Sequence, residues 1–322
     1  MIDLSVIIVN WNTARLLDAC LQSLINGVHH VKIEFFVVDN GSSDGSQDMV
    51  RKKYPSVRLI ENTSNQGFAR ANNQAIRKAR GRYVVLLNSD TVVPDYAMDK
   101  LAAAMDSDTK IGIGGLQLLN DDGTLQNSIA NTPALLTELT NKSLLRRLFP
   151  GRFPGKEFRP DHPIEVESLI GACLIVRAET VQDIGLLDED YFFFLEETDW
   201  CLRARRGGWK VVFFPHITIY HLQGKSAAKV PIPARIEYWR SRYLFFDKHY
   251  SPFVCSLFYA GMGMKIFIEL HFSLIFSLVS QKGRDLFRLY FNTTAKNGPL
   301  VFNSIISLFF LKTNNCLKNA FF

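Results

Sequence analysis

Cysteine is scarce in this chain of 322 residues, and its five cysteines show no metal-binding spacing. They are scattered, odd in number and free of any CxxC pair, so they indicate neither a disulfide framework nor a zinc site. A reducing compartment fits this usage best. The chain also lacks internal repeats, low-complexity tracts and, at its N-terminus, the cationic start and cleavage site of a signal peptide. We therefore expect the catalytic part to stay inside the cell.

The first part of the chain has no net positive charge, because the excess of basic residues lies toward the end of the chain. The formal net charge is +6, yet the residues from Lys225 onward carry 13 Lys and Arg against 4 Asp and Glu. A basic region rich in phenylalanine fits nucleic acid or an anionic membrane surface. Its apolar content favours the membrane, so we predict a membrane partner and no nucleic-acid partner.

The apolar segment 252–279 is interrupted by Lys265, Glu269 and His271. A lysine at the middle of a bilayer costs about 3 kcal/mol, so a simple spanning helix is not expected. Small and polar residues recur every fourth position and would form one stripe on a helix: Gly261, Lys265, Glu269, Ser273 and Ser277. Such a helix can lie in the membrane interface or dock on protein. We expect attachment to a membrane surface, supported by Lys282, Arg284, Arg288 and the apolar segment 305–311; the alternatives are a homodimer interface and a buried helical cap.

Strand and helix patterns alternate through the first part of the chain. Short apolar runs predict strands over residues 4–9, 33–38, 57–60 and 83–87. Helical patterns fill residues 13–27, 47–53 and 68–80 between them. This alternation predicts an α/β fold with a parallel sheet, whose ligands bind at the carboxyl ends of the strands.

Later segments continue the pattern less regularly. Residues 168–176 and 210–214 are strand candidates, with a helix over about 198–207 between them. Residues 120–163 contain many turn residues and a basic piece at Arg146, Arg147 and Arg152. We expect this segment to be a loop-rich insertion near the acceptor side.

Three polar clusters follow predicted strands and should meet at one edge of the sheet. They are residues 10–12, 39–46 and 88–90. Asp39 could accept hydrogen bonds from a base or a ribose, or could simply belong to a tight turn. Asp90 could hold a hard divalent cation against a diphosphate, or could cap the next helix. His221 is a candidate second metal ligand, although a structural role is the alternative.

A dense acidic cluster follows an aromatic run. Glu196, Glu197 and Asp199 lie directly after the apolar residues 191–195. Mutual repulsion and apolar surroundings raise the pKa of carboxyl groups, which suits a general base. The alternative is a helix N-terminus whose acids complement the helix dipole.

Six ordered motifs together resemble family 2 glycosyltransferases of the GT-A fold, in particular the rhamnosyltransferase-like branch. They are SVIIVNWN (5–12), VDNGSSDGS (38–46), NQGFARANN (65–73), LLNSD (86–90), GACLIVR (171–177) and LEETDWCLR (195–203). The resemblance covers residues 3–226. It implies an inverting transfer of a sugar from a nucleotide-diphosphate donor, with the fold of a Rossmann-like, mostly parallel sheet with flanking helices.

The resemblance also implies roles on the donor side. Asp39 matches the acid that contacts the nucleotide base. Asp90 matches the last acid of the Asp-x-Asp motif and should hold Mg²⁺ or Mn²⁺, whereas Asn88 stands where the family has the first acid. The remaining positions implied to bind donor are Val9, Asn10, Asn12, Gly67, Arg70, Asn73 and Ser89.

On the acceptor side, the family usually has Glu-Asp-x-Asp, and its second acid deprotonates the acceptor hydroxyl. This chain has Glu-Glu-Thr-Asp, which makes Glu197 the expected base and Glu196 an acceptor ligand. Asp199 is expected to orient neighbours such as Arg203. The matching motifs add Gly171, Ala172 and Trp200 as acceptor-side or supporting residues.

The organisation that follows is a GT-A catalytic domain over residues 1–226 and a helical, basic and apolar region over residues 227–322. Within the domain, residues 1–118 form the nucleotide-sugar half and 119–226 the acceptor half. The donor would be dTDP-rhamnose or a UDP-sugar, and we expect the acceptor to be a lipid-linked glycan in cell-surface polysaccharide synthesis. The chain lacks the Gln-x-x-Arg-Trp motif and the several spanning helices of processive synthases, so single or few additions are expected. The expected location is the cytoplasmic face of the cell membrane, as a peripheral or monotopic protein.

Two rival functions stay open at this stage. The segment Gly112-Ile-Gly-Gly resembles the start of a dinucleotide loop, but Gln117 stands at the position of its third glycine. The second rival is a membrane-bound scaffold that keeps the fold without catalysis. It is supported by Glu197 and Asn88, which stand where the family has aspartates.

Overall fold

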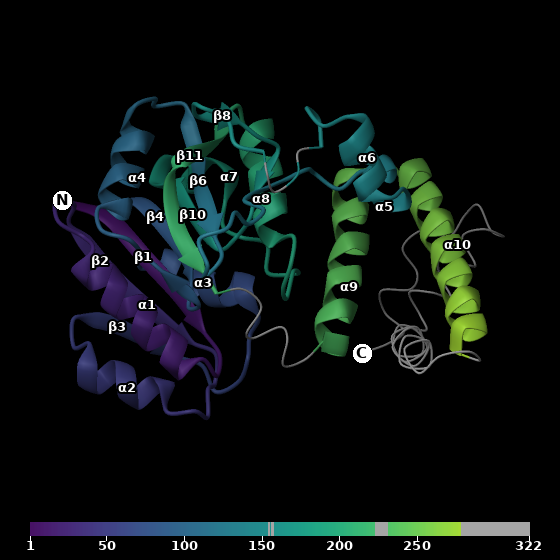
Figure 1. Ribbon diagram of the computed structural model, residues 1–322. Helices are drawn as coiled ribbons and strands as arrows, with labels where there is room; N and C mark the ends of the chain where they lie inside the picture. Colours follow the sequence, from purple (N-terminus) through teal and green to yellow (C-terminus); the bar gives the residue numbers. More distant parts are fainter. Residues whose placement is uncertain (154, 156–157, 223–230, 278–322) are drawn as a thin grey trace. The chain divides into compact units, whose positions relative to one another are not determined.

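The chain forms two compact units, seen in a computed structural model that describes residues 1–153, 155, 158–222 and 231–277 (Figure 1). The first unit comprises Met1–Thr132 and Pro150–Val230, and the second comprises Pro133–Phe149 and Pro231–Phe322. The expected boundary at residue 226 lies outside the described residues. Residues 133–149, expected in the acceptor half, pack instead with the C-terminal helices, because Leu135 and Leu139 contact the aromatic core of those helices.

The first unit is built on a nine-stranded mixed sheet with the order β3-β2-β1-β4-β10-β6-β11-β5, with β8 paired to β11. Its strands are β1 (Ile2–Asn10), β2 (Ile33–Asp39), β3 (Val57–Glu61), β4 (Gly81–Asn88), β5 (Thr91–Val92), β6 (Ile111–Leu119), β8 (Ile164–Glu165), β10 (Cys173–Arg177) and β11 (Lys210–His221). A small second sheet pairs β7 (Ile129–Ala130) with β9 (Ser168–Leu169). The four predicted strands of the first half are parallel neighbours, as expected.

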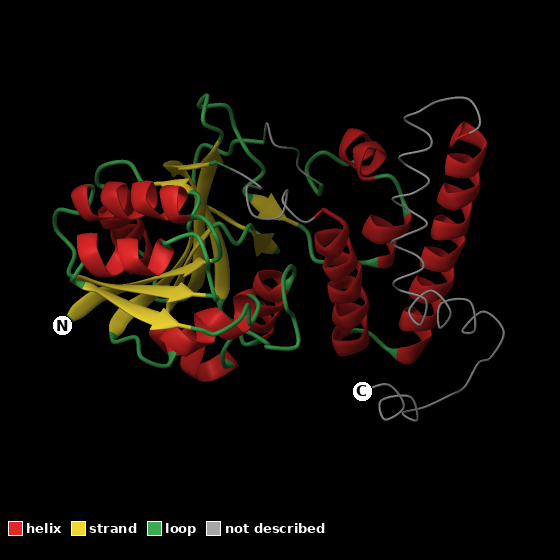
Figure 2. Cartoon of the chain, turned by 90° about the horizontal axis from the view of Figure 1, so that it is seen from below, coloured by secondary structure: helices red, strands yellow, loops and turns green. Residues whose placement is uncertain are grey.

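Helices cover both faces of this sheet (Figure 2). They are α1 (Ala14–Asn26), α2 (Ser46–Lys53), α3 (Phe68–Ile76), α4 (Ala97–Asp106), α7 (Ala178–Ile184) and α8 (Glu196–Arg206). Side chains alternate between the faces of a strand, so Val6 and Ile8 of β1 join one apolar core and Ile7 joins the other. The first core includes Leu17 of α1, and the second includes Trp200 of α8.

Two later segments differ from their predicted form. The strand expected over residues 168–176 is two strands, since β9 pairs with β7 whereas β10 runs antiparallel between β4 and β6. The Gly112-Ile-Gly-Gly segment lies inside β6, so the dinucleotide-loop interpretation is wrong. Its glycines allow close packing: a Cβ on Gly114 would lie 2.8 Å from Met105 and Phe214, and one on Gly115 would lie 2.8 Å from Leu169.

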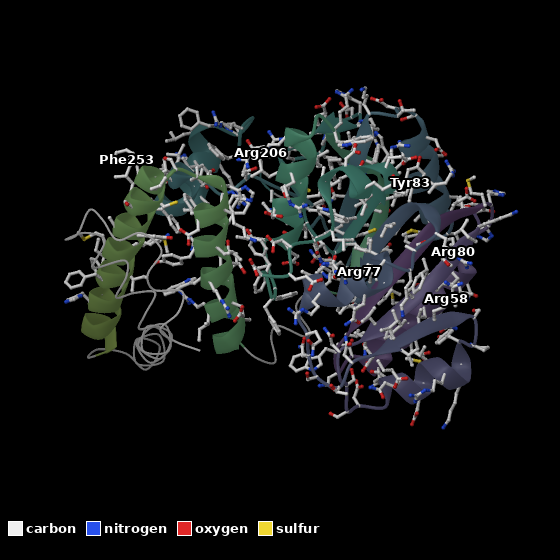
Figure 3. The ribbon with its side chains drawn as sticks, turned by 180° about the vertical axis from the view of Figure 1, so that it is seen from behind. Arg58, Arg77, Arg80, Tyr83, Arg206 and Phe253 are labelled. Atoms are coloured by element: carbon white, nitrogen blue, oxygen red, sulfur yellow. The ribbon has the colours of Figure 1, made fainter. Side chains whose placement is uncertain are left out.

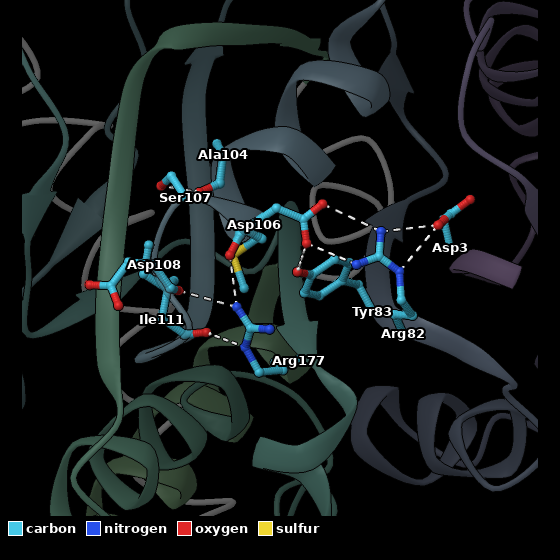
Figure 4. A network of polar contacts seen from close by, with 10 residues as sticks. Asp3, Arg82, Tyr83, Ala104, Asp106, Ser107, Asp108, Ile111 and Arg177 are labelled. Atoms are coloured by element: carbon cyan, nitrogen blue, oxygen red, sulfur yellow. Dashed lines mark hydrogen bonds and ion pairs between the residues drawn. The ribbon is translucent and has the colours of Figure 1, made fainter. Parts of the chain in front are cut away.

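A polar network closes the edge of the sheet opposite to the carboxyl ends of β1 and β4 (Figure 4). Arg82 donates to Asp3 at 3.0 Å and to Asp106 at 2.8 Å, and the Tyr83 hydroxyl donates to Asp106 at 2.6 Å. Arg177 donates to the carbonyl oxygens of residues 105, 108 and 111. The hydrogen bond from Arg82 lowers the pKa of Asp106. This network joins α4 to the sheet.

The second unit contains α5 (Leu135–Leu139), α6 (Lys142–Leu148), α9 (Pro231–His249) and α10 (Pro252–Ser277). Its core is aromatic: the Phe246 and Phe258 rings stack with centroids 3.8 Å apart, and Tyr243 packs edge-on to Phe258. Gly261 and Lys265, two members of the predicted polar stripe, both contact α5. That part of the stripe therefore docks on protein.

On the outside of α10, by contrast, apolar side chains are exposed to solvent. They are Phe253, Leu257, Met264, Phe267, Ile268 and Phe272, and we call this set the apolar stripe. Phe253 projects outward from the start of the helix (Figure 3). Among the described helices, none is both long enough and apolar enough to cross a membrane. Lys282, Arg284, Arg288 and the segment 305–311 lie outside the described residues.

Candidate active site

The carboxyl ends of β1, β2 and β4 bring the three predicted polar clusters together. Asn10 lies opposite Asp39 in the β1–β2 register, and Val9 lies opposite Asn88 in the β1–β4 register. The Asn10 side chain donates to Asp39 at 2.8 Å. Thr13, which precedes α1, donates its hydroxyl to Asn10 at 2.6 Å and lies 2.9 Å from the Ser89 hydroxyl. The three strand ends thus form one continuous polar surface.

Asp39 is fully buried and organises the turn that follows β2. It accepts hydrogen bonds from the Ser42 amide and from the Gln47 side chain, both at 2.8 Å. Asn12, whose φ is +55°, accepts a hydrogen bond from the Ser43 amide at 2.8 Å and donates its own amide to the Ser42 hydroxyl at 2.9 Å. The first two polar clusters are therefore held against each other by their own side chains.

Asp90 and His221 are brought face to face. Thr91 of β5 pairs with His221 of β11, and the Leu222 amide donates to the Asp90 carbonyl oxygen at 2.8 Å. Asp90 Oδ1 lies 3.3 Å from His221 Nε2, and both side chains are nearly buried. The structure thus joins the two predicted metal ligands, although they lie 131 positions apart in the chain. Among the described residues, no cluster of three or more His, Cys, Asp or Glu side chains forms.

Gln126 fixes the tautomer of His221. Its Nε2 donates to the His221 carbonyl oxygen at 2.5 Å and to Asn120 Oδ1 at 2.8 Å, so its Oε1 faces His221 Nδ1 at 3.0 Å. An amide oxygen only accepts, so Nδ1 carries the proton. When Nε2 is unprotonated, it turns a lone pair toward the Asp90 carboxylate. The lone pairs of His221 Nε2 and of the Asp90 carboxylate attract a cation between or beside them. A metal-binding histidine typically also makes a hydrogen bond through its other ring nitrogen, as His221 Nδ1 does with Gln126.

The acidic cluster opens α8 after a strained turn. Phe194 and Leu195 have φ values of +73° and +67°, which few residues with side chains adopt. Glu196 is only 4% exposed, and its Oε2 has no hydrogen-bond partner among the described residues. Glu197 is half-buried and accepts a hydrogen bond from the Thr198 hydroxyl at 3.1 Å.

Desolvation dominates the acidity of this pair. Burial, reinforced by the neighbouring Glu197 carboxylate, raises the pKa of Glu196 well above its ordinary value. Burial also raises the pKa of Glu197, against hydrogen bonds from its own backbone and from Thr198. Both shifts favour carboxyl groups that take up protons at a higher pH than an exposed glutamate does.

The polar edge of the sheet and the acidic pair meet on one backbone segment. The Asn88 amide, at the end of β4, donates to the Ala172 carbonyl oxygen at 2.9 Å. A Cβ built on Gly171 would lie 3.4 Å from Cγ of Glu197. Glu197 and the strand that leads to Asp90 are therefore both neighbours of residues 171–172.

Three predicted supporting residues brace the segment before the acidic cluster. The expected contact of Asp199 with Arg203 is present, with Arg203 Nε 2.7 Å from Asp199 Oδ2. Arg203 also donates to the carbonyl oxygens of Ile184 and Leu186, and Trp200 Nε1 donates to the Gly185 carbonyl oxygen at 2.9 Å. These side chains fix the start of the loop over residues 185–195.

The same loop is fastened to α3, where the sequence predicted donor-binding residues. The Asn73 side chain donates to the Leu187 carbonyl oxygen at 2.8 Å and accepts from the Leu187 amide at 3.1 Å. Glu189 receives ion pairs from Arg70 at 3.1 Å and from Arg77, labelled in Figure 3, at 2.9 Å. We call these contacts the α3 clamp. In the structure, Arg70 and Asn73 position the acidic loop.

Gly67 completes the α3 clamp. Its φ is +82° and its ψ 174°, and a Cβ there would lie 2.5 Å from the Phe192 carbonyl oxygen. That same oxygen accepts a hydrogen bond from the Phe68 amide at 2.7 Å. Sequence reasoning missed Gln126 and Glu189, since each works through partners about 95 to 119 positions away that only the fold brings near.

The mixed sheet with helices on both faces is a GT-A-like fold. A mannosyltransferase of Pyrobaculum calidifontis, solved with GDP-Man and Mn²⁺, matches with a TM-score of 0.53 over 96% of this chain and 88% of that chain, at 16% identity. GalNAc-T7, solved with UDP, GalNAc and Mn²⁺, matches with a TM-score of 0.58 over 82% of this chain and 51% of that chain, at 17% identity. At these identities the likeness shows the fold alone.

The sequence itself gives the family. The chain belongs to glycosyl transferase family 2, whose model matches residues 5–182. It is 26% identical over 262 residues to the N-acetylglucosaminyl-diphospho-decaprenol L-rhamnosyltransferase of Mycobacterium tuberculosis, covering 76% of this chain and 85% of that protein. The predicted resemblance to the rhamnosyltransferase-like branch is confirmed.

Proposed function

We propose that this protein is an inverting glycosyltransferase that moves one sugar from a nucleotide-diphosphate donor to a lipid-linked glycan acceptor in cell-surface polysaccharide synthesis. Family membership supports the reaction class. The name of the mycobacterial relative, which acts on a diphospho-decaprenol substrate, supports a lipid-linked acceptor and dTDP-rhamnose as donor, with a UDP-sugar as the second choice.

The observation that carries this proposal is the pair of carboxyl groups at the start of α8. A buried carboxylate oxygen without a partner among the described residues, as on Glu196, fits a substrate hydroxyl that supplies the missing donor. Glu197 beside it is more accessible and has a raised pKa, which suits a group that takes a proton. Glu196 would therefore bind the acceptor, and Glu197 would be the base.

The reaction needs one base. The Glu197 carboxylate takes the proton of the acceptor hydroxyl as that oxygen attacks the anomeric carbon of the donor. The bond between the anomeric carbon and the donor diphosphate breaks, and its electron pair leaves on the diphosphate. Because attack and departure occur on opposite faces, the configuration inverts. Gly171, Ala172 and Trp200 would support the acceptor side of this arrangement.

Asp90 and His221 would hold Mg²⁺ or Mn²⁺. Their facing oxygen and nitrogen atoms, 3.3 Å apart and oriented by Gln126, fit a divalent cation. When bound, such an ion neutralises charge on the departing diphosphate. Asn88 and Ser89 share this strand end and would line the diphosphate with uncharged groups.

The nucleoside would lie at the ends of β1 and β2. Asp39 would contact the base beside the backbone of Val9 and Asn10, with Asn12 at the adjoining turn. Gly67, Arg70 and Asn73 would shape the donor pocket indirectly, because their contacts in the structure hold the loop over residues 185–195. The nucleotide-sugar half would be residues 1–118 and the acceptor half 119–226, apart from residues 133–149.

The helical unit would attach the enzyme to the cytoplasmic face of the membrane, as a peripheral or monotopic protein that makes single or few additions. The apolar stripe of α10 supports this location, since exposed aromatic and aliphatic side chains on one helix fit a membrane interface. A homodimer through the same region is the alternative. Sedimentation of the intact chain with and without vesicles distinguishes the two.

The test combines donor binding with base replacement. UDP, dTDP and GDP, each with Mn²⁺ or with EDTA, are screened for a shift of the unfolding midpoint, since a ligand of the folded state raises it. Glu197→Gln should then lower transfer by about 10²–10⁴-fold and leave the donor-induced shift intact. Glu179→Gln, an exposed glutamate on α7, is the matched control and should keep wild-type transfer.

The results also decide between enzyme and scaffold. Near-full transfer by Glu197→Gln would refute the base assignment. A folded wild-type protein without a shift for any nucleotide diphosphate and without hydrolysis of nucleotide sugars would instead identify an inactive scaffold.

A further inference from the structure

The helical unit contains a cavity of about 790 Å³ that the proposed reaction does not use. It lies among α5, α6, α9 and α10, and the residues that decide its chemistry are Glu138, Lys142, Arg242, Met264, Lys265 and Ile268. Every one of these belongs to the same compact unit. This volume lies within the range of ligand-binding pockets in proteins.

Cations outnumber carboxylates in this cavity. Glu138, only 3% exposed, is ion-paired with Arg242, only 7% exposed. Lys142 Nζ lies 3.5 Å from Oε1 of Glu138, and Lys265 Nζ lies 3.3 Å from its carbonyl oxygen. The described lining residues thus include one carboxylate and three cationic side chains. The excess of two positive charges favours an anion.

Arg242 presents a second, independent sign of a ligand. Its Nη2 contacts Glu138 and Met262 Sδ, yet its Nε is buried without a hydrogen-bond partner among the described residues. Leaving a buried guanidinium N–H without an acceptor is unfavourable, and more so because the group is charged. A phosphate oxygen in the cavity would supply that acceptor, and arginine is well suited to phosphate.

The cavity is also continuous with the apolar stripe. Met264 and Ile268 line the cavity and are themselves 54% and 45% exposed members of the stripe. A ligand that places an anionic group near Arg242, Lys142 and Lys265 therefore meets exposed hydrocarbon directly beside it. Free phosphate uses only the first of these features, whereas an amphiphile uses both.

We infer that this cavity binds the phosphate or diphosphate headgroup of a lipid, with the lipid chain lying along the apolar stripe. The binding is argued from the cavity alone; its link to the acceptor rests on the proposed function, in which the acceptor is lipid-linked. Arg242 and the two lysines contact the phosphate oxygens, and Met264 and Ile268 contact the first carbons of the chain.

The experiment measures binding by the full chain in EDTA, so that no metal-dependent donor site contributes. Vesicles of phosphatidylcholine containing phosphatidic acid are compared with vesicles containing phosphatidylglycerol, adjusted to equal surface charge. Decyl phosphate and inorganic pyrophosphate are titrated as soluble probes. We expect tighter binding to phosphatidic acid than to phosphatidylglycerol, and to decyl phosphate than to pyrophosphate.

Variants assign the binding to the cavity. Lys142→Gln and Lys265→Gln should each weaken binding to phosphatidic acid about fivefold, and the double variant about thirtyfold. Lys248→Gln, at the exposed end of α9, removes the same charge outside the cavity and should change it less than twofold. Met264→Gln with Ile268→Gln should weaken decyl phosphate and leave pyrophosphate unchanged.

Three outcomes would overturn the inference. Equal loss from Lys248→Gln and Lys265→Gln would show general surface charge, and equal affinity for pyrophosphate and decyl phosphate would show a site for a soluble anion. Absence of binding to any anionic vesicle would remove the site. The shift caused by UDP or dTDP with Mn²⁺ is measured on each variant, so failure of lipid binding is distinguishable from failure of the proposed transferase or of folding.

Discussion

Replacing Gly67 by alanine should move the acidic loop and thereby the proposed base. Gly67 has φ +82° and ψ 174°, a region that residues with a Cβ almost never adopt. The added methyl group would also lie 2.5 Å from the Phe192 carbonyl oxygen, four positions before Glu196. The backbone of the loop must shift, and the hydrogen bond from the Phe68 amide to that oxygen must lengthen or break.

Gly185→Ala is a control that separates the cost of backbone strain from the cost of the close approach to Phe192. Its φ of +79° and ψ of −178° match those of Gly67, yet a Cβ there would meet nothing within 4 Å. Gly185→Ala should therefore lower the free energy of unfolding by the backbone cost alone, about 1–3 kcal/mol. Gly67→Ala should lower it further, by about 0.5–1.5 kcal/mol for the hydrogen bond.

Two measurements check this reasoning. Urea denaturation of both variants gives the difference in free energy of unfolding, and steady-state kinetics give kcat for transfer. A displacement of about 1 Å at catalytic groups can lower the rate by on the order of 10²-fold, so Gly67→Ala should lose kcat much more than Gly185→Ala does. Equal stability and equal kcat in the two alanine variants would refute the idea that close approach at Phe192 positions the acidic pair.

Four further predictions concern protons and the metal. Desolvation raises the pKa of Glu197, and only its ionised form accepts a proton. We therefore expect kcat/KM to decrease as the pH drops through a pKa that lies above the ordinary glutamate range. A decrease at the ordinary glutamate pKa in the pH–rate profile would contradict this. Because the pKa of Glu196 is raised in the folded state, its contribution to stability is lost as the pH rises through that folded-state pKa. Glu196→Gln should therefore raise the Tm at pH 8, by about 2–4 °C for each kcal/mol of stability regained, and leave the Tm unchanged at pH 4. Gln126→Leu should weaken Mn²⁺ binding about 10–100-fold in a titration, since it removes the group that orients His221, and unchanged affinity would exclude that role. The lowered pKa of Asp106 gives stability that is lost as pH falls, so Asp106→Asn should reduce the change in urea midpoint between pH 7 and pH 3, whereas an undiminished change would assign the acid sensitivity to other groups.

Local patterns in the sequence predicted the first half of the fold well. The apolar runs that became β1, β2 and β4 are largely buried on both faces, so composition alone marks them as strands of a covered sheet, whereas β3 is the partly exposed edge strand. The β6 strand was not predicted, because its glycines look like a loop. Their purpose becomes visible only when Met105, Phe214 and Leu169 pack against them.

The candidate site was likewise predictable from the sequence only in part. The clusters at strand ends could be predicted to meet, because parallel strands end at one edge, and Asp90 does face His221. The role of Asn73 could not be read from its neighbours in sequence, since its partners are Leu187 and Glu189. Residues 133–149 were placed in the wrong unit by proximity in the chain; the aromatic core that accepts Leu135 and Leu139 comes from α9 and α10.

The two-part composition of the helical unit also sets an order of folding. Helix α5 leaves the ribosome long before α9 and α10, the helices that bury it, have been made. At about 5–20 residues per second, on the order of ten seconds separates these events. During that time Glu138 has no Arg242 to pair with, and Leu139 has no Gly261 to pack against. The mixed sheet can form while α5 still lacks its packing partners. The last helices to be synthesised therefore complete the second unit and bury α5.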